Sequence, residues 1–420
     1  MRRLKYILTA LILGASVQLT ACGTEDGSVS RGQSDEYRTE LTKDEIKGGH
    51  VSFHMDENLV VDADVTAEEK YEKGLSSYYL KVFCETEKKS EKKFLEAPTL
   101  SLHSFEEWEK MLNKILPGKF KDKTFQLDKK DADIQQAYQG ENGNSYSFHV
   151  NWSNYTRGVE EKTRFNTPVI KVGFDSGGAS YEAKTVRSYV QDYHGSDKVS
   201  FLQDAEGYIE RMKEFLKEIT GRSVYEGYDF SVVSKETIGM LKEAHSWMTT
   251  IDEPEEEYAA FYFYFDIDGL PLKRLTLEYL MENDETADEL CYWSSEPGNR
   301  LTGLSEHEQE MLIDKDGVIY LECSNMWDSG EVYKEGLSVV SPNEALKQVK
   351  EHYSRQLLKE ECVVTDIGLV YSGYFSDGAD GEIRPIISPF WAIKVYEGDN
   401  KSYVYFVYDA YTGECISEGV

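Results

Sequence analysis

The chain has 420 residues, with 46 Lys and Arg against 77 Asp and Glu, so its formal net charge is −31 at pH 7. So acidic a surface repels nucleic acid, anionic lipid headgroups and anionic wall polymers, which excludes partners bound through a basic patch. A hydrophobic fraction of 40%, with 29 Tyr and 18 Phe, predicts a folded body rather than a disordered chain. The length predicts two or three domains.

The first residues have the organisation of an export signal. Arg2, Arg3 and Lys5 form a basic start, and an uncharged, mostly apolar run covers residues 6–19. A basic start before a short apolar run is typical of a secretory signal peptide. The run is shorter than the roughly 20 residues that a membrane-spanning helix needs. We therefore expect residues 1–21 to be a signal peptide, whose removal changes the net charge from −31 to −34.

The end of this segment, Leu19-Thr20-Ala21-Cys22, resembles the lipobox of bacterial lipoproteins. The resemblance implies cleavage before Cys22 and a thioether-linked diacylglycerol on its sulfur, and two acyl chains suffice for stable membrane anchoring. Residues 22–48 are mainly Gly, Ser, Thr and charged residues, which predicts a flexible tether. The alternative is an ordinary secreted protein in which Cys22 carries no lipid.

An internal repeat organises the rest of the chain. Residues 100–108, 199–207 and 337–345 align without gaps, each with an aliphatic residue, a Ser, an apolar residue and a Glu seven positions after the start. Each segment leads into apolar residues spaced by three and four, which predicts one amphipathic helix per copy. The three apolar stripes are Trp108, Met111, Leu112 and Ile115; Ile209, Met212, Leu216 and Ile219; and Ala345, Leu346, Val349 and Tyr353.

The repeated Glu has a structural explanation. Ser104 with Glu107, and Ser341 with Glu344, have the spacing of capping boxes, in which hydroxyl and carboxylate satisfy each other's backbone N–H groups. Pro342 stands at the first helical position, where its missing N–H costs nothing. In the second copy, Asp204 can serve as the cap instead. We therefore interpret the repeated Glu as a cap and not as a catalytic acid.

Strands rich in aromatic residues follow each helix pattern, and a hairpin is expected between residues 50 and 65. We therefore predict an α+β protein of three repeated units, each a helix on an antiparallel sheet. The predicted strands after the helices are 146–152, 228–233, 260–266, 368–371, 390–396 and 403–409, with a further strand at 317–323. The predicted units are 49–195, 196–335 and 336–420.

The C-terminal part resembles the PepSY/YycI-like units, a PepSY- or cystatin-like architecture, of exported Gram-positive proteins. The resemblance rests on the helix-before-sheet order and on the terminal segment from Asp409 to Glu414. The whole chain is similar to uncharacterised Firmicutes lipoproteins in its lipobox, its 327–331 strand end and its 337–344 helix start. The PepSY-type resemblance implies binding or inhibitory roles, such as restraining a peptidase or sensor kinase, and no functional residue is transferred from it.

Motifs of common catalytic and cofactor sites are missing from the sequence. It has no Gly-x-Ser-x-Gly, phosphate-binding loop, Gly-x-Gly-x-x-Gly or His-Glu-x-x-His. His50 and His54 lie four apart in a strand pattern without an evident third ligand, so we predict no metal there. Residues 314–317 begin like a calcium loop, but Cys323 stands where the bidentate Glu should be, which favours a hairpin turn. No cofactor is predicted.

Cysteine content does not indicate a disulfide scaffold, because five cysteines besides Cys22 are an odd number and no Cys-x-x-Cys occurs. Export permits disulfides, so Cys291–Cys323 and Cys362–Cys415 stay open as pairs, with buried free thiols as the alternative.

Together these features favour a non-enzymatic, lipid-anchored binding or regulatory lipoprotein on the extracytoplasmic face of the cell membrane. Its expected partners are the membrane, through the diacylglycerol, and a membrane or envelope protein, but not nucleic acid. One alternative is a solute-binding lipoprotein of a transporter, which predicts two lobes of parallel strands, each strand followed by a helix. Another is a wall or glycan hydrolase, which requires two carboxylates in a cleft.

Overall fold

The computed structural model describes most of the C-terminal half of the chain and separate stretches of the N-terminal half. The described residues are 37–67, 73–80, 110, 114, 134–139, 145–156, 164–174, 205–245, 253–254, 256–273, 275, 309–315, 317–323, 329–377 and 383–417. They belong to one compact unit, Tyr37–Val420. Several residues singled out in the sequence lie outside the described part of the chain: Cys22, Ser104, Glu107 and the apolar stripe of the first predicted helix. Of that helix, only Lys110 and Lys114 are described.

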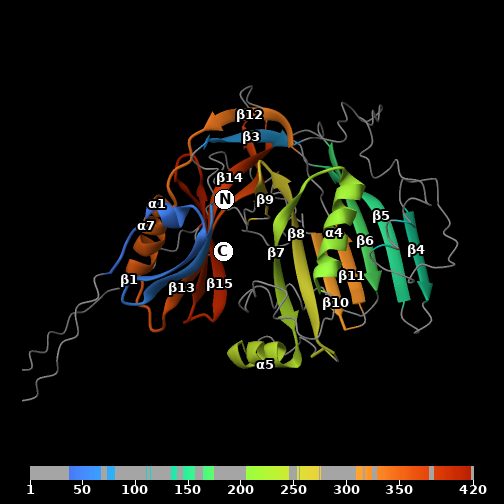
Figure 1. Cartoon of the computed structure of the whole chain (residues 1–420), viewed down its shortest axis with the longest axis horizontal. Helices are drawn as coiled ribbons and strands as arrows, with labels where there is room; N and C mark the ends of the chain where they lie inside the picture. Colours follow the sequence, from blue (N-terminus) through green and yellow to red (C-terminus); the bar gives the residue numbers. More distant parts are fainter. Residues whose placement is uncertain are drawn as a thin grey trace, which may run out of the picture. The chain divides into compact units, whose positions relative to one another are not determined.

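Strands dominate the described part of the chain (Figure 1). The helices are α1 (Lys43–Ile46), α4 (Ala205–Thr220), α5 (Lys235–Ala244) and α7 (Pro342–Ser354). The strands of the N-terminal half are β1 (Gly49–Asp56), β2 (Leu59–Thr66), β3 (Leu75–Leu80), β4 (Ile134–Gln139), β5 (Ser145–Thr156) and β6 (Arg164–Phe174). The remaining strands are β7 (Val224–Val233), β8 (Tyr258–Ile267), β9 (Leu270–Leu272), β10 (Gln309–Asp314), β11 (Gly317–Cys323), β12 (Ser329–Leu337), β13 (Cys362–Asp377), β14 (Ile383–Glu397), β15 (Ser402–Asp409) and β16 (Cys415–Ser417).

Sixteen strands join one hydrogen-bonded network, whose main path is β12-β3-β14-β13-β9-β8-β10-β11-β6-β5-β4. Beside this path, β2 and β1 extend from β13, β15 and β16 extend from β14, and β7 pairs with β8. Among the described pairings, β13 runs parallel to β2 and to β9, and the others are antiparallel.

The prediction of repeated helix-on-sheet units is therefore wrong. A repeat of that kind would pair the strands of each copy among themselves. Instead, β2 pairs with β13, beginning where Leu59 lies opposite Cys362, and β6 pairs with β11. The physical reason is that hydrophobic period and helix capping are local properties. They specify that a strand forms, but not which distant strand completes its hydrogen bonds.

The local predictions on α7 are mostly confirmed. Its apolar stripe of Ala345, Leu346, Val349 and Tyr353 is buried. Ser341 is the N-cap, with its hydroxyl accepting a hydrogen bond from the Asn343 N–H at 3.3 Å, and Pro342 opens the helix. The predicted capping box with Glu344 is wrong in both halves. The Glu344 N–H donates to the Ser341 backbone carbonyl at 3.0 Å and not to its hydroxyl, and the Glu344 carboxylate accepts from Lys347 Nζ at 3.3 Å. In α4, Ile209, Met212 and Leu216 are buried as predicted.

Strand β8 shows how the core is divided. Its alternate side chains belong to two hydrophobic clusters, so both faces of the strand are buried. Phe261, Phe263 and Phe265 join the cluster that also contains residues of α4, including Phe215. The side chains between them join a smaller cluster with residues of α5, including Ile238. A strand covered on both faces loses the polar alternation of a half-exposed one, which explains the continuous aromatic run of residues 261–265.

The predicted hairpin near residue 50 is confirmed, because β1 and β2 pair antiparallel from Gly49 and Val65 to Asp56 and Leu59. The predicted turn at 314–317 is confirmed as well, since Asp314 pairs with Gly317 between β10 and β11. In the part of the chain that the structure describes, no helix combines the length and apolarity needed to cross a membrane.

Candidate functional site

A row of polar residues crosses five neighbouring strands of the sheet. The strand register pairs His50 of β1 with Asp64 of β2, Asp64 with Asp366 of β13, Asp366 with Lys394 of β14, and Lys394 with Tyr405 of β15. Residues paired across neighbouring strands point to the same face of a sheet, so these five share one face. We call them the cross-sheet row.

A cavity of about 140 Å³ lies against this row. Its lining adds Asp62, Asp229, Lys273, Thr365 and Tyr403 to the cross-sheet row. With four carboxylates, two ammonium groups and an imidazole, the lining carries both signs of charge and an excess of negative charge. We call this space the row cavity.

Lys273 reaches the row cavity from a different part of the sheet. It follows β9, and its backbone N–H donates to the Tyr371 carbonyl of β13 at 2.8 Å. Its Nζ lies 3.1 and 3.3 Å from the two carboxylate oxygens of Asp229 on β7, and Tyr264 donates to the same carboxylate. Burial lowers the pKa of Lys273, but the charges of Asp229 and Asp366 outweigh burial and raise that pKa above its ordinary value. Lys273 is therefore an ammonium group at neutral pH.

Lys394 supplies the second positive charge of the lining. Its side chain is 6% exposed, and its Nζ lies 4.4 Å from the ring centroid of Tyr403 and 5.8 Å from that of Tyr405. Aromatic faces attract a cation more strongly when water is excluded. The two rings thus hold the Lys394 ammonium in a defined place beside the row cavity.

His50 bridges two carboxylates at the exposed side of the lining. Its ring nitrogens lie 3.1 Å from Asp64 Oδ1 and 3.1 Å from Asp62 Oδ1. The hydrogen bond with Asp64, followed by that with Asp62, raises the pKa of His50 above its ordinary value. As a result, the imidazolium form persists to a higher pH than that of a free histidine.

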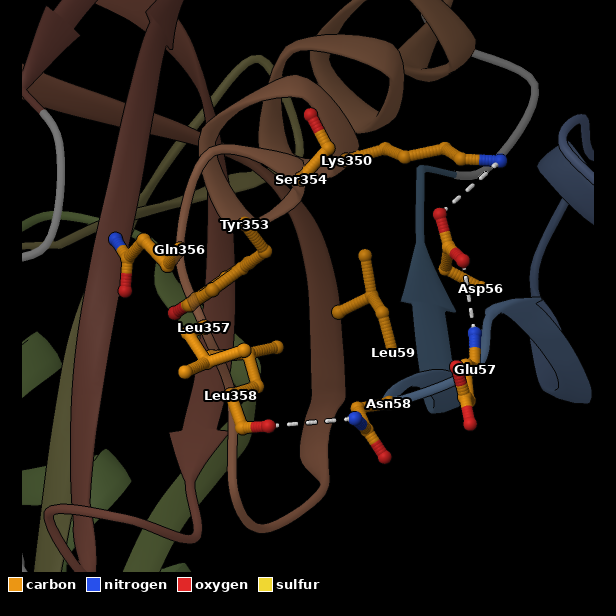
Figure 2. A pocket seen from close by; sticks show the side chains of 10 residues that line it. All are labelled: Asp56, Glu57, Asn58, Leu59, Lys350, Tyr353, Ser354, Gln356, Leu357 and Leu358. Atoms are coloured by element: carbon orange, nitrogen blue, oxygen red, sulfur yellow. Dashed lines mark hydrogen bonds and ion pairs between the residues drawn. The ribbon is translucent and has the colours of Figure 1, made fainter. Parts of the chain in front are cut away.

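A second cavity, of about 260 Å³, lies between the end of α7 and the β1–β2 turn (Figure 2). Lys350 lies 3.8 Å from the Asp56 carboxylate, and Asn58 Nδ2 donates to the Leu358 carbonyl at 3.5 Å. Tyr353 points its hydroxyl to Glu397 at 2.7 Å. The first two contacts join α7 and the segment after it to the hairpin, and the third joins α7 to β14, so we assign this second cavity a structural role.

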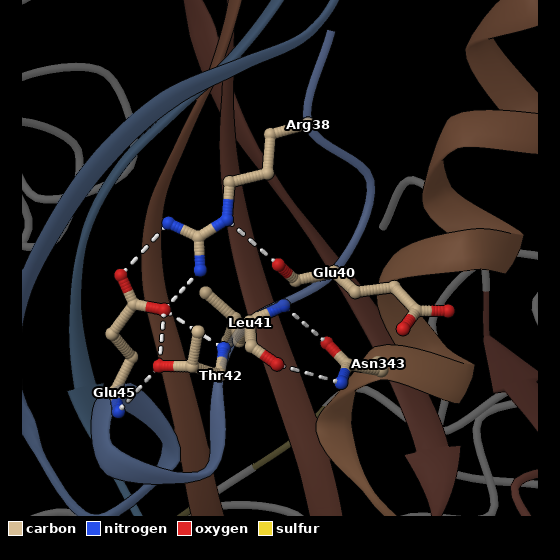
Figure 3. Close-up of polar contacts among 6 residues, drawn as sticks. All are labelled: Arg38, Glu40, Leu41, Thr42, Glu45 and Asn343. Carbon is tan, nitrogen blue, oxygen red and sulfur yellow. Dashed lines mark hydrogen bonds and ion pairs between the residues drawn. The ribbon is translucent and has the colours of Figure 1, made fainter.

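The described chain begins with a set of polar contacts that hold residues 37–46 to the body (Figure 3). The Asn343 side chain accepts from the Leu41 N–H at 2.8 Å and donates to the Leu41 carbonyl at 3.1 Å. Thr42 caps α1 in a capping box with Glu45, whose carboxylate also accepts from both Arg38 terminal nitrogens. The Arg38 hydrogen bond is the main cause that lowers the pKa of Glu45 to about 2.

Glu45→Gln tests these contacts at the start of the body. A carboxyl whose folded pKa is lowered stabilises the fold above its unfolded pKa of about 4.5, and this contribution is lost as the pH falls toward 2. The variant should therefore lose about 1 kcal/mol of unfolding free energy at pH 7. Its unfolding free energy should also change less with pH between pH 4.5 and 2 than that of the wild type. Thermal melts at several pH values measure this.

Asp44→Asn is the matched control for this prediction, since the Asp44 side chain in the same helix is 95% exposed. It should change the unfolding free energy by no more than about 0.5 kcal/mol. If Glu45→Gln and the wild type had the same pH profile, the assigned role of the Arg38–Glu45 pair would be wrong.

The structure places the residues singled out in the sequence as follows. Cys22, the lipidation candidate, lies outside the described residues. His54 pairs with Val60 and does not join His50, and no group of three or more His, Cys, Asp or Glu suited to a metal occurs among the described residues. Cys362 and Cys415 are free thiols, as is Cys323, so the first two do not form a disulfide; Cys291 is outside the described residues.

Sequence reasoning missed most of the row cavity. Asp62, which is exposed, and Asp64, which is half-buried, alternate with buried residues in β2, which is a detectable signal of a polar face. Lys394 interrupts the apolar run of β14, and an isolated cation inside such a run is a signal that it has buried partners. Nothing in the sequence indicates that Lys273 and Asp229 lie opposite these residues.

Comparisons with known proteins give a distant structural neighbour and no family. No family model matches the chain, and no curated protein matches it. A solved crystal structure of an uncharacterised protein from Eubacterium rectale is similar over 88% of this chain and 93% of its own chain. The sequence identity is 17% and the TM-score is 0.46.

Proposed function

We propose that this protein is a lipid-anchored binding or regulatory lipoprotein on the extracytoplasmic face of the cell membrane. The observation that carries the proposal is the sequence of the export signal, a basic start and a short apolar run that end in Leu19-Thr20-Ala21-Cys22. Acylation of Cys22 would attach the body to the membrane through lipid, which suits a body whose net charge of −34 repels anionic headgroups.

Two structural observations support the binding part of this proposal. The row cavity offers charged groups of both signs held by neighbouring side chains, and the predominance of antiparallel pairing suits an accessory protein better than a two-lobed transport protein of parallel strands. The proposal assigns no catalytic step, since the sequence carries none of the catalytic motifs named above.

Cys22→Ala should move the protein from the membrane fraction to the soluble fraction and abolish incorporation of labelled fatty acid. The physical reason is that a single cysteine sulfur carries the diacylglycerol in the proposed anchor. Fractionation of cells that express the full chain, followed by immunoblotting, measures the change.

Cys415→Ala is the matched control, because it removes a half-buried free thiol of the folded body and leaves the export signal intact. It should keep both the membrane location and the lipid label. A Cys22→Ala protein that stayed in the membrane fraction would contradict the anchor.

A further inference from the structure

We propose that the row cavity binds a small zwitterion of the α-amino-acid class. The proposal rests on the binding part of the proposed function, and it does not depend on the lipid anchor. It follows from the order of charges along the cross-sheet row, the size of the cavity and the way in which its two lysines are held.

Two neighbouring aspartates of the cross-sheet row lie between His50 on one side and Lys394 on the other. Asp64 and Asp366 lie on the adjacent strands β2 and β13, and Lys394 lies on the next strand, β14. Adjacent strands are about 4.8 Å apart, so the positions of opposite charge are about 5–10 Å apart. An α-amino acid with one hydrogen bond of about 2.8 Å at each charged end spans about 8 Å. Its ammonium group would lie at the aspartates of the lining, Asp62 and Asp64 on β2 and Asp366 on β13, and its carboxylate at Lys394.

The size of the cavity suits a small ligand. Its volume is about 140 Å³, and L-alanine, with six non-hydrogen atoms, is among the smallest members of the class.

The two lysines of the cavity are preorganised. The Lys394 ammonium is held by the rings of Tyr403 and Tyr405, and Lys273 is held by Asp229. A ligand that meets charges already in place loses less free energy to the ordering of side chains.

Calorimetric titration of the full chain in detergent micelles tests the proposal with four probes. L-Alanine should bind at millimolar concentration or below. Ethylamine and propionate each lack one of its charged groups and should bind at least about tenfold more weakly, because charge-assisted hydrogen bonds at one end are lost. D-Glucose, a neutral ligand of polar cavities, should give no binding heat. Absence of binding by L-alanine, binding of ethylamine or propionate as tight as that of L-alanine, or binding of D-glucose alone would overturn the proposal.

Asp62→Asn provides a test that leaves the buried residues in place, because Asp62 is exposed at the edge of the cavity. This variant should weaken L-alanine binding about fivefold while its melting temperature stays close to that of the wild type. Asp44→Asn, which removes a more exposed carboxylate outside the cavity, should bind L-alanine like the wild type. Equal affinities for wild type and Asp62→Asn would overturn the proposal. Membrane attachment through Cys22 is measured separately, so failure of this inference leaves the anchoring proposal standing.

Discussion

Trp391→Ala is expected to lower the free energy of unfolding by about 3–5 kcal/mol. Trp391 lies in the middle of β14 and is fully buried between its register partners Leu369 and Tyr408, which are fully buried too. Its indole Nε1–H donates to the Val340 carbonyl at 2.9 Å, which ties the segment before α7 to the sheet. The substitution removes that hydrogen bond and leaves a large cavity. Because the free energy of unfolding of a domain is only about 5–15 kcal/mol, the variant would lose a large part of it.

Urea unfolding followed by circular dichroism measures this effect for the wild type, Trp391→Ala and Trp391→Phe. The Phe variant keeps most of the buried volume and loses the indole donor, so its loss should be clearly smaller than that of the Ala variant. A loss below about 1 kcal/mol for Trp391→Ala would contradict the packing of β14 described above.

Leu346→Ala is expected to cost about 2–5 kcal/mol, the range for truncating a buried leucine. Leu346 is 0% exposed on the face of α7 that packs on the core. Leu357 follows the same helix and is 90% exposed, so Leu357→Ala is a matched control with the same chemical change. It should stay within about 0.5 kcal/mol of the wild type.

The two leucine variants make the same chemical change at a buried and at an exposed position, so the difference between them measures the effect of burial. The same urea unfolding experiment applies to both, and the difference in their midpoints is the quantity of interest. Equal losses for the two variants would show that α7 does not pack on the sheet through the predicted stripe.

Individual helices and strands of this protein were predictable because their signals are local. The stripe of α7 and the buried part of the α4 stripe follow the spacing of their apolar residues, and the β1–β2 hairpin follows the two short apolar clusters at 51–53 and 59–61. The N-cap at Ser341 was predictable for the same reason. Its Glu344 partner was not, because Lys347 competes for the same carboxylate.

Strand pairing was not predictable, and the error in the fold class follows from that. A helix followed by strands is the pattern of a repeated unit, but it is equally the pattern of a single sheet whose strands pair across the chain. Leu59 pairs with Cys362, and Val172 pairs with Leu321. No local periodicity distinguishes these partners from nearer ones, since every strand offers the same backbone donors and acceptors.

The sequence by itself determined where α4, α7, the β1–β2 hairpin and the turn at 314–317 form, because period, caps and turn residues act within a few positions. It also contains the export signal on which the anchoring proposal rests. Only the tertiary structure decided which residues meet at the row cavity. His50, Asp366 and Lys394 come from three distant segments, and their shared face exists because β1, β2, β13 and β14 are in one register. Register between distant strands is set by the packing of the whole core, and no local stretch of sequence encodes it.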